Sequence, residues 1–202
     1  MSLENVILVL LYLTSVTGLA VILWRAWALR WSKVTPTRIV DALSFCRTAD
    51  DLDKLQQICV ACPSPLGRLV LFAANHLAWP KAENVSALET AARREVVRLE
   101  SGLFVLEIIV GIAPLLGLVG TIIGMMTVFS GLGDADVTNA AKLAHGISVI
   151  LRATLIGLLI AIPALAAWGY FSKKVEVLTV EMETLCDEFI RRQYVGRNQD
   201  KP

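Results

Sequence analysis

The chain has 202 residues, of which 55% are hydrophobic and 18% are charged, and its mean hydropathy is +0.62. A soluble domain carries about 25% charged residues, so the apolar excess and the clustering of the charges indicate a membrane protein. The formal net charge is +1, and no stretch interleaves basic with aromatic residues, which argues against a nucleic-acid partner.

Three stretches are long and apolar enough to cross a membrane, since about 20 apolar residues span about 30 Å of hydrocarbon. The first runs from Val6 to Trp24 and the second from Ile108 to Gly133, both without a charged residue. The third runs from about Leu143 to Trp168 and is interrupted only by His145 and Arg152. We therefore expect an all-α membrane protein with three transmembrane helices and long cytoplasmic helical extensions.

The charges beside these stretches predict one orientation. Basic residues follow the first and third stretches, whereas the short segment between the second and third leans acidic, and basic residues favour the cytoplasmic side. Glu4 precedes the first stretch and no small-residue cleavage site follows it, which argues against a secretory signal. The expected division is an outer N-terminus (1–5), a first span (6–24), a cytoplasmic helical loop (25–102), a second span (103–130), an outer hairpin (131–142), a third span (143–168) and a cytoplasmic C-terminal helix (169–202).

The predicted cytoplasmic segments have helical patterns. Ser86 and Glu89 have the spacing of a capping box at a helix start, and we expect that helix to run without a break into the second span. Its apolar positions recur every three or four residues, at Leu88, Ala92, Val96, Leu99, Leu103 and Leu106. The same spacing follows the third span, at Val175, Leu178, Met182, Leu185 and Phe189. Each apolar stripe must be buried against another helix.

Four cysteines, Cys46, Cys59, Cys62 and Cys186, lie in these segments. Cys59 and Cys62 have the spacing of half a zinc site or of a redox pair, but a zinc site needs two more ligands, and the nearest candidate is His76. The segment from Cys59 to Pro65 instead indicates a turn between short helices. The predicted topology places all four thiols in the reducing cytoplasm, so we expect no metal and no cofactor.

Polar side chains within the second and third spans are the candidate functional residues, because polar groups in hydrocarbon usually face a bundle interior or a water-filled path. Thr121 lies about 14 Å from the outer end of its span, and Thr154 about 16 Å from the start of the third, at about 1.5 Å per residue. Both hydroxyls are therefore expected near the membrane midplane. The other candidates are Thr127, Ser148 and Arg152.

Each of these two threonines lies in a seam of small residues, which lets helices approach closely. Gly117 and Gly124 share a helical face with Thr121, and Gly157, Ala161 and Ala164 share one with Thr154. Spacing alone leaves two interpretations open and favours the first: the threonines hold a packed helix pair together, or they line an ion path.

The stretch APLLGLVGTIIGMMTVF (113–129) resembles the second-span signature of the MotA/TolQ/ExbB proton channel family, and GISVILRATLIGLLIAIPA (146–164) resembles its third-span signature. The three-span arrangement agrees, so the resemblance covers most of the chain. Beside the threonines, we expect these signature residues to pack the spans: Pro114, Gly117, Gly120, Gly124, Gly157 and Pro163.

The resemblance implies a bacterial inner-membrane subunit that conducts protons, or sodium ions, and couples the gradient to work on an envelope target, as in biopolymer transport. It implies a pentamer, surrounded by lipid, around the single spans of two smaller subunits of the ExbD/TolR/MotB type, whose membrane aspartate carries the ion. Thr121 and Thr154 match the family threonines that face this aspartate. A hydroxyl both donates and accepts hydrogen bonds. Glu107 lies near the cytoplasmic entrance, so the titrating group is expected from the partner.

Two positions depart from the ExbB and TolQ pattern: Val149 stands where those subfamilies often have glutamate, and Arg152 is an addition. An arginine at mid-depth costs at least about 2.5–3.5 kcal/mol. It is expected either to pair with a partner's acid or to extend to the outer surface. His145, at the outer mouth of the span, titrates near neutral pH or simply ends the helix with a polar group.

Two further classes compete with an ion channel. A non-conducting oligomeric scaffold would use the same packed helices. A self-contained transporter is disfavoured by the absence of an inverted repeat. The sequence has no nucleophile with an adjacent base and no phosphate-binding loop, so we expect no enzymatic activity.

Overall fold

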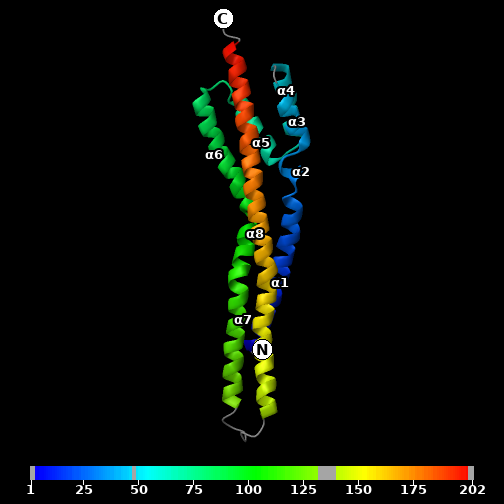
Figure 1. Ribbon diagram of the computed structural model, residues 1–202, viewed down its shortest axis with the longest axis vertical. Coiled ribbons are helices and arrows are strands. Elements are labelled where there is room, and N and C mark those ends of the chain that lie inside the picture. The colour runs from blue at the N-terminus through cyan, green and yellow to red at the C-terminus, as the bar shows by residue number, and fades with distance from the viewer. Residues whose placement is uncertain (1–2, 47–48, 132–139, 200–202) are drawn as a thin grey trace. The chain divides into compact units, whose positions relative to one another are not determined.

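The computed structural model describes residues 3–46, 49–131 and 140–199 (Figure 1). Within these ranges all regular structure is helical, which confirms the predicted all-α fold. The helices are α1 (Leu3–Ala28), α2 (Trp31–Val34), α3 (Thr37–Phe45), α4 (Ala49–Ala61), α5 (Pro65–Asn75), α6 (Lys81–Glu100), α7 (Leu103–Gly131) and α8 (Ala140–Gln199). Most of the predicted outer hairpin, and the side chains of His145 and Val149, lie outside the described residues.

Three helices in the described part of the chain are long and apolar enough to cross a membrane. They are α1 over Val6–Ala28, α7 over Leu103–Phe129 and α8 from Gly146 onward. Large apolar side chains such as Leu13, Ile122 and Leu159 are more than half exposed along them. Such exposure would be costly in water but suits hydrocarbon, so the chain is a multi-pass membrane protein.

The chain divides into two compact units. The first, which we call the span unit, comprises Met1–Arg25 and Gly102–Tyr170. The second, which we call the extension unit, comprises Ala26–Ser101 and Phe171–Pro202. Both α1 and α8 contribute residues to each unit.

In the span unit, α7 and α8 run side by side and bury small residues between them (Figure 1). Ala113 of α7 and Ala161 and Ala164 of α8 form a buried cluster with Ile109. Gly18 of α1 also lies against Ile109, because a Cβ built on this glycine would be 3.4 Å from the isoleucine Cδ1. Small side chains thus let three apolar helices pack at short distances.

In the extension unit, the predicted stripe of α8 is buried: Val175, Leu178, Met182 and Phe189 are each at most 2% exposed. Leu185 is only half-buried, and its neighbour Cys186 takes the buried position. The predicted turn after Cys59 lies at 62–64, where Ser64 caps α5 by accepting a 3.0 Å hydrogen bond from the Gly67 amide.

Two expectations for α6 are wrong. The helix begins at Lys81, not at Ser86, because Pro80 has the extended backbone of an N-cap and its carbonyl accepts hydrogen bonds from the Glu83 and Asn84 amides. The helix also does not continue into α7, since Ser101 and Gly102 form a turn. A Cβ at Gly102 would meet the Arg25 guanidinium, so a larger residue here would require the arginine side chain to move.

The buried face of α6 also contains a charge that the apolar pattern did not predict. Glu95, beside Val96, is 5% exposed. Its carboxylate accepts hydrogen bonds from Arg68 Nε at 3.0 Å and from an Arg98 guanidinium nitrogen at 2.7 Å. Burial by itself would raise the pKa of Glu95, but the hydrogen bonds and charge of Arg68, with those of Arg98, outweigh it and hold this pKa below its ordinary value. The pair joins α5 to α6.

We predict that Arg68→Met destabilises the protein by about 2 kcal/mol at neutral pH, since hydrogen bonds to a buried charge contribute about 1.5–3 kcal/mol. The measurement is denaturant unfolding in detergent, followed by circular dichroism. Because the folded-state pKa of Glu95 is depressed, the contribution is present above the unfolded pKa of about 4.3 and is lost as the pH falls through the folded pKa.

The matched control is Arg191→Met, which removes an arginine paired with Asp187 where both side chains are more than half exposed. Such a pair contributes at most about 1 kcal/mol. Equal losses for the two variants would contradict a special role for the buried carboxylate.

Candidate functional site

The two signature threonines lie on facing helices of the span unit. Thr154 of α8 donates a hydrogen bond from Oγ1 to the Gly117 carbonyl of α7, at 3.2 Å. Thr121 donates to the Leu118 carbonyl of its own helix, at 2.6 Å. Both side chains are half-buried. Each hydroxyl oxygen keeps lone pairs that can accept a further hydrogen bond, and its proton can turn to another acceptor.

Both threonines line one open cavity of about 800 Å³ between α7 and α8. The other lining residues are all apolar: Leu118, Ile122, Met125, Met126, Phe129, Ile147, Ile150 and Leu151. A charge placed here would be poorly solvated, and the hydroxyls are the lining groups able to solvate it. The apolar lining was not predicted from the sequence, although Met125 and Phe129 follow Thr121 at the four-residue spacing of one helical face.

Glycines bring α7 and α8 close together. A Cβ on Gly117 would lie 2.9 Å from Thr154 Cα, and one on Gly157 would lie 2.5 Å from the Ala113 carbonyl oxygen. Gly120 and Gly124 are similarly close to Ala153 and Ile150, at 2.8 and 2.6 Å. A side chain at any of these positions would push the helices apart. The short approach is also what allows Thr154 to reach the backbone of α7.

The signature prolines take less part in this contact. Pro114 is half-buried within α7, next to Ala113. Pro163 lies within α8, is exposed and borders a different groove, beside α1.

The remaining predicted polar residues lie away from the threonine cavity. Thr127 and Ser148 are exposed, and Thr127 donates to the Ile123 carbonyl at 3.0 Å. Arg152 is exposed and lines a separate groove that includes α1 residues. Glu107 is exposed near the first turn of α7. The structure therefore brings together Thr121 and Thr154 but not the other three candidates.

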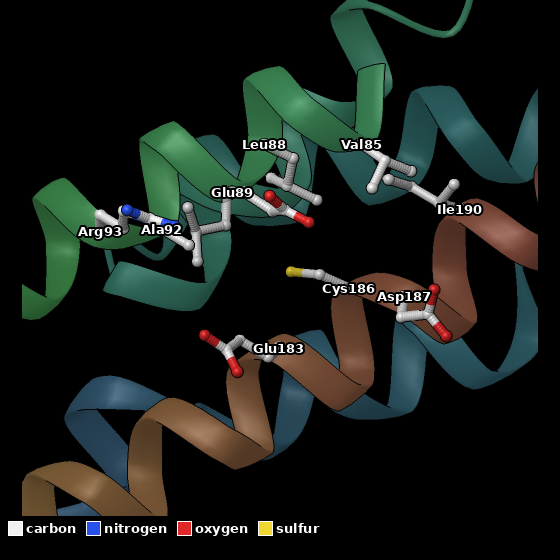
Figure 2. A pocket seen from close by; sticks show the side chains of 10 residues that line it. Val85, Leu88, Glu89, Ala92, Arg93, Glu183, Cys186, Asp187 and Ile190 are labelled. Carbon is white, nitrogen blue, oxygen red and sulfur yellow. The ribbon is translucent and has the colours of Figure 1, made fainter. Parts of the chain in front are cut away.

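The extension unit has a cavity of its own, about 420 Å³, between α6 and α8. Figure 2 shows the Cys186 thiol pointing toward α6, with Glu89 and Glu183 nearby. Among the described residues, no group of three or more histidine, cysteine or acidic side chains could hold a metal ion. Burial raises the pKa of Cys59 to about 11, so this thiol stays protonated and unreactive at neutral pH.

The span unit thus defines the class: a helical multi-pass membrane protein with a sparsely polar intramembrane cavity. Residues 70–184 match the MotA/TolQ/ExbB proton channel family. The chain belongs to this family, as its two signatures predict.

The relatives of this chain differ in how much of its length they match. The Tol-Pal system protein TolQ of Pseudomonas aeruginosa is 40% identical over 103 residues, which cover 51% of this chain and 45% of that protein. The putative biopolymer transport protein ExbB-like 3 of Synechocystis sp. is 32% identical over 194 residues, 93% of this chain and 91% of that protein. Against TolQ of P. aeruginosa and of Haemophilus influenzae, the chain spans about half of the relative's length.

We predict that Gly157→Ala destabilises the span unit by about 1–3 kcal/mol, the usual cost of overpacking, because the new methyl group would meet the Ala113 carbonyl. Thermal unfolding in detergent measures the change. Gly111→Ala is the control, since a Cβ there meets no atom within 4 Å, and alanine favours a helix by about 0.5–1 kcal/mol. If both variants shifted the midpoint in the same direction by the same amount, the close helix contact would be contradicted.

Proposed function

We propose that the chain is the ion-conducting subunit of an energy-transducing complex in the bacterial inner membrane, with protons as the permeating ion. Membership of the proton channel family supports this role. The observation that carries it is the placement of Thr121 and Thr154 as the two polar side chains lining an otherwise apolar cavity. The role is transport rather than catalysis.

The titrating group comes from a partner, because the cavity is lined by no acidic or basic side chain. A single transmembrane helix with an aspartate, contributed by a small subunit of the ExbD/TolR/MotB type, fits an open groove between two helices. A carboxylate in such surroundings has a raised pKa unless hydrogen-bond donors stabilise its charge. The threonine hydroxyls supply those donors, and the apolar wall favours the protonated acid.

The partner's acid alternates between the threonine hydroxyls and the apolar wall. This alternation couples proton transfer to movement of the partner. The deprotonated acid is held at the hydroxyls, and the protonated acid is free to move along the apolar wall. A proton that crosses about 100 mV releases roughly 2.3 kcal/mol, which is available for a step of one subunit set against the other. We place five copies of this chain around the partner, with the N-terminus in the periplasm and the C-terminus in the cytoplasm.

We predict that Thr121→Val and Thr154→Val each reduce proton flux through the assembled complex about tenfold or more. Valine keeps the shape but removes the hydroxyl, and a hydrogen bond to a charged group contributes about 1.5–3 kcal/mol. Flux is measured in vesicles under an imposed potential with a pH-sensitive dye, after the complex has been shown to assemble. Thr127→Val, at an exposed threonine outside the cavity, is the control and should leave flux unchanged.

The same two valine variants distinguish an ion-conducting role from that of a non-conducting scaffold. A non-conducting scaffold would assemble with either valine and retain whatever work the complex performs. Normal flux in the Thr121→Val/Thr154→Val double variant would exclude the proposed path.

A further inference from the structure

Arg152 lies on the side of α8 that faces away from the threonine cavity. Two residues apart on an α-helix, side chains point about 200° apart, and Arg152 lines a groove of about 290 Å³ that Thr154 does not. No acidic side chain lines this groove, and the titratable neighbour of the arginine there is the phenol of Tyr12. None of the ion pairs among the described residues includes Arg152. Within the described part of the chain, its charge is therefore not neutralised by an acid.

The glycine contacts place Arg152 at the depth of the two threonines. A Cβ built on Gly120 would lie 2.8 Å from the Cβ of Ala153. Gly120 directly precedes Thr121, and Ala153 stands between Arg152 and Thr154. The Arg152 backbone and both threonines therefore lie at one level of the span unit. Thr121 is about 14 Å from the outer end of its span, so this level is deep in the hydrocarbon.

Other charges of the span unit lie far from this level. Two further charged side chains of the unit are described, Arg25 and Glu107. Glu107 is about 21 Å from Thr121 along α7, and Arg25 lies against Gly102, about 28 Å from Thr121. The side chains of Glu4, Asp134, Asp136, Lys142 and His145 lie outside the described residues. Among the described side chains, Arg152 is therefore the one charge at the level of the threonines.

A charge on the far side of α8 acts on the cavity through the helix. An α-helix with its side chains is about 10–12 Å across, which is the separation expected between the guanidinium and an acid held at the threonine hydroxyls. At an effective dielectric constant of about 20, Coulomb's law gives two unit charges at this separation an interaction equivalent to about one pH unit. Arginine keeps its charge in proteins, so the field is permanent.

From this geometry we infer that Arg152 sets the pH at which the acid in the threonine cavity gives up its proton. The inference rests on the proposed function, because the acid belongs to the partner. The apolar wall favours the protonated acid, and the positive charge across α8 favours the deprotonated one. Without the arginine, the acid would keep its proton to higher pH. Arg152 thus acts on the charge of the acid without touching it.

The test is the pH dependence of carbodiimide labelling in the assembled complex. Dicyclohexylcarbodiimide is apolar and modifies carboxyl groups in their protonated form. The labelled fraction of the partner's acid, measured by mass spectrometry after a fixed short time, therefore gives the midpoint of its titration. Arg152→Gln should raise this midpoint by about one pH unit, a roughly tenfold change in the protonation equilibrium.

Two further variants serve as controls. Arg152→Lys keeps the positive charge and should move the midpoint much less than Arg152→Gln does. Arg191→Gln removes an exposed charge of the extension unit and should leave the midpoint unchanged.

Two results would overturn this role of Arg152 and leave the proposed proton path intact. An unchanged midpoint in Arg152→Gln would mean that an acid such as Glu4, or a lipid headgroup, already neutralises the arginine. An equal shift in Arg152→Lys and Arg152→Gln would assign the effect to the shape of the side chain. If no carboxyl group of the partner is labelled at any pH, the proposed proton path itself fails, and the role of Arg152 fails with it.

A second variant keeps the test decisive if Arg152→Gln does not assemble. Leu159→Arg adds a charge two turns after Arg152 on the same side of α8, at a side chain that is 62% exposed. The new charge is about 7.5 Å beyond Thr154 along the helix. It should lower the midpoint by about half a pH unit or more, and an unchanged midpoint would overturn the proposal.

Discussion

The close contact of α7 with α8 is the constraint on which the span unit depends. Apolar helices in a membrane gain little from hydrophobic burial against each other, because the lipid is as apolar as they are. Their association must come from short distances, which Gly117 and Gly157 provide by lying against the opposite backbone. Larger side chains here would remove the contact and, with it, the hydrogen bond from Thr154 to the Gly117 carbonyl.

The same contact gives the cavity its chemical character. Since glycines and alanines occupy the interface, the large side chains of α7 and α8 project to either side and form walls such as Ile122 and Leu151. Two hydroxyls remain at the junction of those walls. The cavity is therefore weakly polar at one place and apolar elsewhere.

The sequence predicted the parts of the fold that depend on composition and local period. Twenty or more apolar residues define a span whatever surrounds them, and small residues recurring on one face of a helix mark a surface that another helix can approach closely. Prediction from the sequence failed where a contact with a distant residue determines the local structure. The close approach of Gly102 to Arg25, which is 77 positions earlier, and the burial of Glu95 beside Arg68 of another helix depend on contacts that no local period encodes. The apolar walls of the cavity could not be predicted, because an apolar side chain in a span faces lipid, another helix or a cavity with equal ease.

The hydrogen bond of Thr154 also sets the axial register of α7 against α8. A slide of one helix by a single turn, about 5.4 Å, would separate the Thr154 hydroxyl from the Gly117 carbonyl and move the glycines away from the backbone that they face. The two helices therefore form one rigid pair that tilts or rotates as a body and does not slide along itself.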